Sequence, residues 1–306
     1  MRRILAGLLA CCVAACDSSG ETSLDQCSNG RDDDADGLAD CADLACHVYA
    51  FCEGDDAGRP DAGPIDAAPR PDGAACARPI DLVIVADVSS SMVGALEQLE
   101  QESEAIVATV RALDASSTVS LVVFVDDALA VDECAPLADA ASLSGALAAR
   151  RALAPENRSP VSGTINQDCA ENGLDALSLA VAECPWRAGA AHVILHVTDD
   201  TFAERPTVLS GPFGGGVLVQ HTFDETADAL VATGARVVAL TRQGAGRDCG
   251  ATRVSPDVGR GFHAPYLAMP SIPERTAGIV LDLDAWRDGT VDLAASIAAV
   301  AEPACQ

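Results

Sequence analysis

The chain has 306 residues, which is enough for one large domain with a sizeable core and some accessory segments. Hydrophobic residues make up 49% of the sequence but aromatic residues only 3%, so we expect a core built mainly from Ala, Val, Leu and Ile. The formal net charge of −27 argues against nucleic acid as a partner, because phosphate binding needs a basic surface. An excess of carboxylates suits hard cations such as Ca²⁺ and Mg²⁺ instead.

The first residues have the pattern of an export signal. Arg2 and Arg3 precede an apolar stretch, Ile4 to Ala15, that is too short to span a bilayer as a helix. Small residues directly before Cys16 resemble the lipobox of bacterial lipoproteins. That resemblance implies a signal peptide over residues 1–16, lipidation of Cys16 and an anchor in the bacterial cell envelope, on its periplasmic face or on the cell surface. An ordinary secretory signal with an incidental cysteine is the alternative.

The thirteen cysteines indicate an oxidising compartment. After three in the leader, four lie between Cys27 and Cys52 and six between Cys76 and Cys305. Even numbers in separate segments are typical of disulfides. Zinc is the competing interpretation, but no paired C-x-x-C motifs occur. Cys76 and Cys305 could close the main domain and Cys249 could tie down a long loop, although pairing does not follow from sequence.

A compact acidic segment, residues 27–52, lies between a polar tether (17–26) and a linker rich in Asp, Ala, Gly and Pro (53–75). Its aspartates have the spacing of an EF-type calcium loop, with glycine at the sixth position for the sharp bend. The expected Ca²⁺ ligand positions are Asp32, Asp34, Asp36, Leu38, Asp40 and Asp43. Since two long flanking helices are missing, the segment resembles the disulfide-stapled acidic repeats of thrombospondin type 3. A solvated acidic loop without calcium is the alternative.

From residue 76 to residue 306 the sequence alternates between strand and helix patterns. The strands are expected at Ile80–Ala86, Val119–Val125, His192–Thr198, Arg236–Leu240 and Ile279–Leu283. The helices are expected at Met92–Leu113, Leu137–Leu153, Glu171–Cys184, Asp224–Thr233 and Val291–Val300. Near-continuous β-branched strands are typical of a parallel sheet covered on both faces. The pattern therefore predicts a doubly wound α/β domain with a mostly parallel central sheet and helices on both faces.

The most specific motif is Asp-x-Ser-x-Ser at the end of the first strand. Asp87 ends the buried strand, and Ser89 and Ser91 follow at alternate positions before a long helix. The carboxyl ends of strands line the ligand crevice of doubly wound folds. One carboxylate and two hydroxyls there suit Mg²⁺, which prefers oxygen ligands and keeps positions for water. Helix capping by one serine is the alternative, but it leaves the aspartate unexplained.

With these residues the domain resembles a von Willebrand factor type A domain with its metal-ion-dependent adhesion site. The resemblance implies a second-loop threonine and a third-loop aspartate in the site, and Thr164 and Asp199 match those positions, with Ser162 as the alternative to Thr164. It also implies Mg²⁺ or Mn²⁺, one open coordination position, and a protein partner that supplies a carboxylate. A surface polysaccharide and a matrix component are the alternative partners. Long segments at Asp200–His221 and Thr241–Pro273 follow strands, so we expect them beside the metal.

Two other functions are weighed against metal-dependent binding. A phosphatase of the haloacid dehalogenase type would need a second acid where Ser89 stands, and no H-E-x-x-H or G-x-S-x-G motif occurs, so we expect no enzyme. His192 and His196 share one strand face and are interpreted as packed or capping residues and not as ligands. The other alternative is a metal-free structural module of an envelope assembly.

Overall fold

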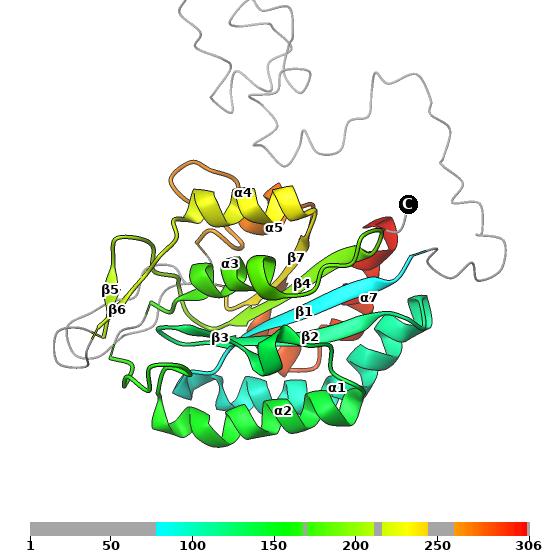
Figure 1. Ribbon diagram of the computed structural model, residues 1–306, viewed down its shortest axis with the longest axis horizontal. Coiled ribbons are helices and arrows are strands. Elements are labelled where there is room, and N and C mark those ends of the chain that lie inside the picture. Colours follow the sequence, from blue (N-terminus) through cyan, green and yellow to red (C-terminus); the bar gives the residue numbers. More distant parts are fainter. Residues whose placement is uncertain (1–77, 168–169, 211–215, 244–259, 305–306) are drawn as a thin grey trace, which may run out of the picture. The chain divides into compact units, whose positions relative to one another are not determined.

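The computed structural model describes residues 78–167, 170–210, 216–243 and 260–304, drawn in colour in Figure 1. All of them belong to one compact unit that spans Gly73–Gln306. The predictions for the leader, tether, calcium loop and linker lie outside the described residues. So do those for Cys76, Cys249 and Cys305. Within the described part, no helix is both long and apolar enough to cross a bilayer.

A six-stranded sheet forms the centre of this unit, with strand order β3-β2-β1-β4-β7-β8. The parallel strands are β1 (Ile80–Asp87), β2 (Thr118–Phe124), β4 (Ala191–Thr198), β7 (Arg236–Thr241) and β8 (Ile279–Asp282). The edge strand β3 (Ala128–Ala130) pairs antiparallel with β2. The order reverses at β1, since the chain builds β2 and β3 on one side and β4, β7 and β8 on the other. Ligand crevices of open α/β sheets lie at such a reversal.

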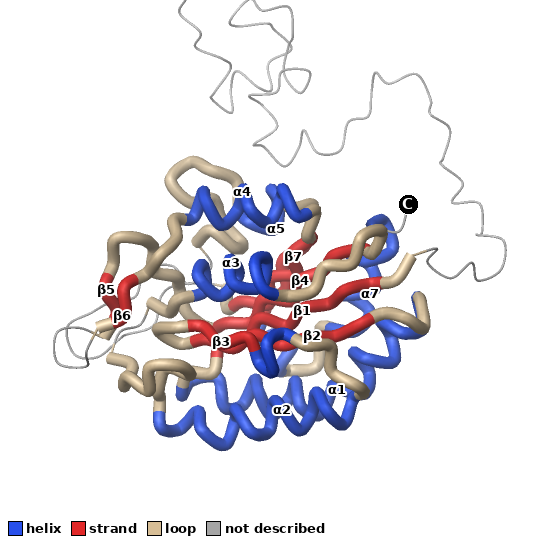
Figure 2. Tube along the Cα trace, viewed as in Figure 1, coloured by secondary structure: helices blue, strands red, loops and turns tan. Residues whose placement is uncertain are grey.

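Helices cover both faces of the sheet, as Figures 1 and 2 show. One face is packed by α1 (Val93–Leu113), α2 (Ala140–Leu153), α6 (Leu283–Arg287) and α7 (Leu293–Ala304). The other is packed by α3 (Gly173–Glu183), α4 (Phe223–Thr233) and α5 (Ile272–Arg275). Short 3-10 turns at Ser90–Met92, Val131–Cys134 and Ala154–Glu156, and the strand pair β5 (Val208–Leu209) and β6 (Val217–Leu218), complete the fold. The predicted doubly wound, mostly parallel α/β fold is confirmed.

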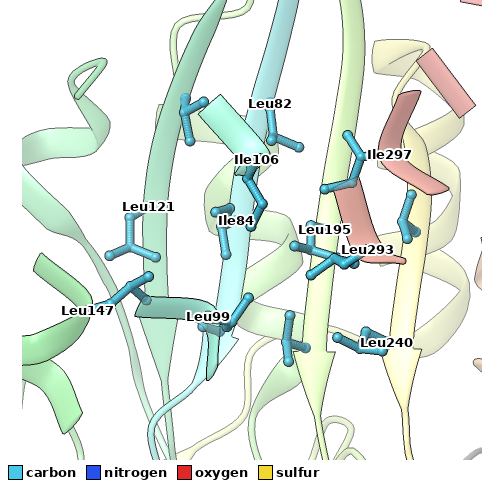
Figure 3. Packing of buried hydrophobic residues seen from close by; sticks show 14 of the residues in the cluster. Leu82, Ile84, Leu99, Ile106, Leu121, Leu147, Leu195, Leu240, Leu293 and Ile297 are labelled. Carbon is cyan, nitrogen blue, oxygen red and sulfur yellow. The ribbon is translucent and has the colours of Figure 1, made fainter. Parts of the chain in front are cut away.

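Alternating side chains of β1 supply both cores. Leu82 and Ile84 point to the layer of α1, where Leu99 and Ile106 pack against the sheet (Figure 3). Val83 and Val85 point to the opposite layer, which contains most of the phenylalanines. Burying each such aliphatic side chain stabilises the fold by about 1.5–3 kcal/mol. The continuous apolar runs in the sequence thus follow from a sheet that is buried on both faces.

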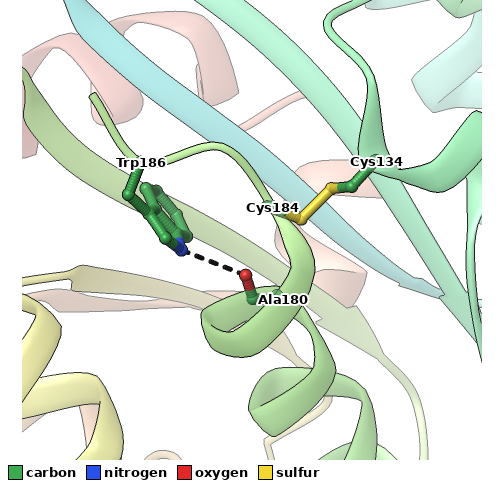
Figure 4. Close-up of a disulfide and its surroundings, with 4 residues drawn as sticks. All are labelled: Cys134, Ala180, Cys184 and Trp186. Atoms are coloured by element: carbon green, nitrogen blue, oxygen red, sulfur yellow. Dashed lines mark hydrogen bonds between the residues drawn. A yellow bond between two sulfur atoms is a disulfide. The ribbon is translucent and has the colours of Figure 1, made fainter.

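One disulfide joins Cys134, after β3, to Cys184 at the end of α3, with 5.0 Å between their Cα atoms (Figure 4). The bond confirms the disulfide interpretation for these two cysteines. Beside it, the Trp186 indole N–H donates a hydrogen bond to the Ala180 carbonyl at 3.0 Å, which closes the end of α3.

The element boundaries differ from the predictions where side chains cap a helix. Asp139 accepts a hydrogen bond from the Ser142 amide at 2.8 Å, so α2 begins at Ala140 and not at Leu137. Asp282 caps α6 in the same way, and the last strand therefore ends at Asp282 instead of Leu283. The helix predicted from Glu171 begins at Gly173, which leaves Glu171 in the preceding loop.

Candidate metal centre

The site lies at the carboxyl edge of the sheet, where β1 and β4 end side by side. Ala86 pairs with Val197 in parallel register, so Asp87 at the end of β1 lies next to Thr198 at the end of β4. The Thr198 hydroxyl donates a hydrogen bond to Asp87 Oδ2 at 2.9 Å. Asp199 follows directly, so both predicted aspartates are at the point where the strand order reverses.

A chain of hydrogen bonds connects four of the five predicted residues. Asp87 Oδ1 accepts from the Ser89 amide at 2.8 Å, which bends the backbone after β1. The hydroxyls of Ser89 and Ser91 are 3.0 Å apart. The Ser91 hydroxyl donates to Asp199 Oδ1 at 2.7 Å. Two carboxylates and two hydroxyls from opposite sides of the switch point therefore converge.

The fifth predicted residue, Thr164, is in a loop with its own internal hydrogen bonds. Its amide donates to the Ser162 hydroxyl at 3.3 Å, and its carbonyl accepts from the Ser159 amide at 2.9 Å. Among the described interactions, neither Thr164 nor Ser162 bonds through its side chain to the other four. The loop meets the motif through Asn157, whose Oδ1 accepts from the Ser90 amide at 2.9 Å. A metal ligand from this loop thus stays a prediction.

The carboxyl edge contains an unusual number of buried acids. Five carboxylate side chains there are at most 7% exposed: Asp87, Asp126, Glu171, Asp199 and Asp200. Burial, and after it the charge of Asp199, raises the pKa of Asp87 to about 7. Burial, followed by the charges of Asp87, Asp126 and Asp200, raises the pKa of Glu171 well above its ordinary value. The ionised forms of Asp87 and Glu171 are therefore destabilised by burial first and by neighbouring carboxylates second.

Positive charge at this edge comes from arginine, since no lysine contributes to the 19 basic residues of the chain. Arg242 approaches Asp199 Oδ2 at 4.0 Å and also bonds Asp284 at 3.1 Å. The guanidinium of Arg242 is thus shared between Asp199 at the edge and Asp284 on α6.

The residues present fit a small divalent ion. Their donors are carboxylate and hydroxyl oxygens, the ligands that Mg²⁺ and Mn²⁺ prefer. Within the described ranges, no three His, Cys, Asp or Glu side chains gather closely enough to hold an ion alone. Hydroxyls and water would therefore have to complete its shell, as is usual for Mg²⁺. The donor set suits an open site better than a closed all-protein cage.

Sequence reasoning missed the residues that support the edge from other loops. Asp126, which is fully buried, accepts from the hydroxyls of Ser159 at 3.1 Å and Ser210 at 2.5 Å. Its carbonyl accepts from the Asn172 side chain at 2.8 Å. Asp126, which comes two residues after the end of β2, thus joins three loops beside the motif. Its position directly after a predicted strand was the available signal, the same one that identified Asp199.

The histidines of β4 are packing residues, as predicted. His196 is buried between the rings of Phe124 and Phe262, at centroid distances of 5.5 and 4.6 Å. Burial lowers its pKa to about 3, so the imidazole is neutral. His192 bonds the carbonyls of Thr233 and Arg187 at 2.8 and 3.2 Å. Neither imidazole takes part in the edge network.

No protein-family model matches the chain, and no curated protein matches it significantly. Among solved structures, it is similar to an aerotolerance-related membrane protein from Bacteroides fragilis (16% identity, 74% of this chain and 98% of that chain covered, TM-score 0.43). BatB from Bacteroides thetaiotaomicron is similar at 15% identity, over 73% and 99%, with a TM-score of 0.43. Proximal thread matrix protein 1 from the mussel byssus, with a zinc-occupied MIDAS motif, is similar at 16% identity, over 76% and 47%, with a TM-score of 0.43. With TM-scores below 0.5, these likenesses assign neither a family nor a function to the chain.

Proposed function

We propose that residues 76–306 form a von Willebrand factor type A module that binds a partner protein through a divalent metal. Asp87, Ser89, Ser91 and Asp199 would hold the ion, with a residue of the Thr164 loop completing the site. The observation that carries the proposal is the continuous Asp87–Ser89–Ser91–Asp199 network at the switch point of the sheet. A bound Mg²⁺ or Mn²⁺ would supply positive charge among the buried acids of the edge and a coordination position for a partner's carboxylate.

The surface next to the motif supports a protein partner. Five of the seven large apolar side chains that are exposed in the described residues come from two segments that meet the carboxyl edge. They are Leu153, Val161 and Ile165 beside the Ser90–Asn157 contact, and Val208 and Leu218 on the β5–β6 pair after β4. Clusters of exposed apolar side chains are typical of protein interfaces. A polysaccharide would not gain from such a surface to the same degree.

A cavity adds a basic group to this surface. It has a volume of about 190 Å³, and Val88 of the motif, Leu153, Arg150 and Arg158 are among its lining residues. In the described structure Arg150 forms no ion pair, although acids outnumber bases by 46 to 19 in the chain. A partner that places one carboxylate on the metal could place a second acidic side chain against Arg150. We therefore propose an acidic, partly apolar docking segment on the partner.

Metal-dependent capture of envelope proteins tests the proposed function. The parent chain and an Asp87→Ala, Ser89→Ala variant would be incubated with solubilised envelope in Mg²⁺ or in chelator. Capture by the parent in Mg²⁺ alone is the expected result, with circular dichroism showing that the variant is folded. Asp288→Ala, an exposed aspartate outside the edge, is the matched control and should behave as the parent. Equal capture in chelator would leave the metal-free structural module as the better explanation.

The proposal assigns no catalytic role. His221 Nδ1 is 2.7 Å from Asp175 Oδ1, but no serine or cysteine in the described residues hydrogen-bonds this histidine. A nucleophile next to its base is the usual sign of covalent hydrolysis. His221 has no such partner among the described residues, and we prefer the binding interpretation over a hydrolase.

Two further parts of the proposal concern the residues before the module. We propose a lipid anchor on Cys16 in the bacterial envelope and a Ca²⁺ site on the aspartates of residues 27–52. Mass spectrometry of the protein from its native membrane tests the first, where an unmodified N-terminus would contradict it. A Ca²⁺-dependent change in the circular dichroism of residues 27–52 tests the second. A segment this small needs metal or disulfides to fold, so an unchanged spectrum would contradict the calcium site.

A further inference from the structure

The loop before α3 crosses over the end of β1. The Glu171 amide donates to the Thr201 carbonyl at 2.9 Å, just beyond β4. The Asn172 amide donates to the Val125 carbonyl at 2.7 Å, just beyond β2. Because β1 lies between β2 and β4, residues 171 and 172 bridge the two neighbours of β1 at the edge where β1 ends in Asp87.

Among the described residues, only one carboxylate oxygen of Glu171 has a hydrogen-bond partner. Oε1 accepts from the Asn166 side-chain amide at 2.8 Å. Oε2 is buried and has no hydrogen-bond partner among the residues that the structure describes. The residue as a whole is 3% exposed, so bulk water does not solvate this oxygen. Buried polar atoms without a partner are uncommon in folded proteins, and such atoms need an explanation.

The groups around Glu171 do not explain why an acidic side chain occupies this buried position. The charges that act on it are those of Asp87, Asp126 and Asp200, all of them acids. No arginine of the described residues forms an ion pair with it. An apolar or amide side chain would fill the same position without opposing three carboxylates. A cation bound beside it would stabilise the ionised form of an acid at this position.

We propose that Glu171 is a further residue of the metal site, whose free Oε2 accepts a hydrogen bond from water bound to the ion. Direct contact together with Asp87 and Asp199 does not fit, since no three acids in the described structure gather at ligand distance. An outer position explains why Oε2 has no partner among the described residues. Three carboxylates of the site, on Asp87, Asp199 and Glu171, then outweigh the divalent charge and favour tight metal retention. This inference rests on the proposed metal site.

A titration of Mn²⁺ followed by electron paramagnetic resonance tests the role of Glu171 in the full chain. Glu171→Gln keeps the shape and the acceptor for Asn166 but removes the charge. We expect its Mn²⁺ affinity to fall at least tenfold, whereas Glu171→Asp should lose less. Glu183→Gln, the same change on an exposed residue at the other end of α3, is the matched control and should bind as the parent does.

The outcomes separate this inference from the proposed function. If Glu171→Gln binds Mn²⁺ as the parent does while Asp87→Ala loses the site, the role of Glu171 is wrong and the metal site stands. If the parent and Asp87→Ala bind identically, the metal site itself fails. Should Glu171→Gln not fold, carboxyl-¹³C labelling of glutamate in the parent decides. The Glu171 signal should move on saturation with Mg²⁺, and an unmoved signal would overturn the inference.

Discussion

The strand β1 contains two buried aspartates, one near each end, and the structure treats them differently. Asp81, at the amino end, is 2% exposed and Asp87, at the carboxyl end, is 0% exposed. The Arg187 side chain bonds Asp81 through Nε at 2.7 Å, and the Arg187 amide and the Thr118 hydroxyl bond it at 2.7 and 2.9 Å. Asp87 receives only neutral donors, from Ser89 and Thr198.

The pairing of a buried acid with a cation distinguishes an acid that stabilises the fold from one that is available to bind a ligand. A buried carboxylate that stabilises a fold is paired with a cation and has its remaining lone pairs satisfied, as Asp81 has. The carboxyl edge instead gathers five buried acids, and Asp87 among them is bonded by neutral donors. Such an arrangement is explained when a cation completes it in the working state.

Removing the cation at the amino end should destabilise the protein whether or not metal is present. Arg187→Met leaves Asp81 buried without its guanidinium, and we expect a loss of about 3 kcal/mol in unfolding free energy. In thermal denaturation this corresponds to a fall in Tm of roughly 6–12 °C. Mg²⁺ should not restore it. A Tm within about 1 °C of the parent would show that the Asp81 pair is not structural.

Acidification should destabilise the protein because His196 on β4 is buried, so its protonation is unfavourable in the folded state. Its folded pKa of about 3 lies below the unfolded value of about 6.5, so the stability it allows is complete above pH 6.5 and falls as the pH decreases toward 3. Between pH 7 and 4.5 the expected loss is about 3 kcal/mol. Urea denaturation of the parent and His196→Leu at both pH values measures it. An equal loss in the variant would assign the acid sensitivity elsewhere.

Replacing Asp87 by a neutral residue should not destabilise the metal-free protein, in contrast to Arg187→Met. Asp87→Asn removes an uncompensated buried charge, so the metal-free protein should keep its Tm within about 2 °C or gain stability. The rise in Tm that Mn²⁺ causes in the parent should be absent. Thermal denaturation with and without Mn²⁺ measures both effects. A large loss of stability without metal would make Asp87 a structural acid like Asp81.

Removing Arg242 should have the smallest effect and should favour the metal. Its guanidinium is 4.0 Å from Asp199 Oδ2, so Arg242→Gln removes a competing positive charge from the edge. Because the side chain is partly exposed, we expect only a two- to fivefold gain in Mn²⁺ affinity. Arg275→Gln, whose ion pairs are with Asp224 and Asp228 on α4, is the control. Weaker binding in Arg242→Gln would mean that this arginine positions Asp199.

The parts of the fold with a repeated local pattern were predictable from the sequence. Apolar β-branched runs located β1 and β4, and the spacing of Asp87, Ser89 and Ser91 after one run located the motif. The edge strand β3 was missed because three residues are too few for a pattern to develop. Glu171 was assigned to the first turn of a helix, since its position depends on hydrogen bonds to Thr201 and Val125 that no local pattern encodes.

Isothermal titration of Mg²⁺ and Mn²⁺ into the parent chain and into Asp87→Ala tests the central claim most directly. The predicted result is one ion fewer in the variant, with unchanged circular dichroism and with any binding to residues 27–52 common to both proteins. Identical isotherms for the two proteins would contradict the claim that the carboxyl edge of the sheet is a metal site.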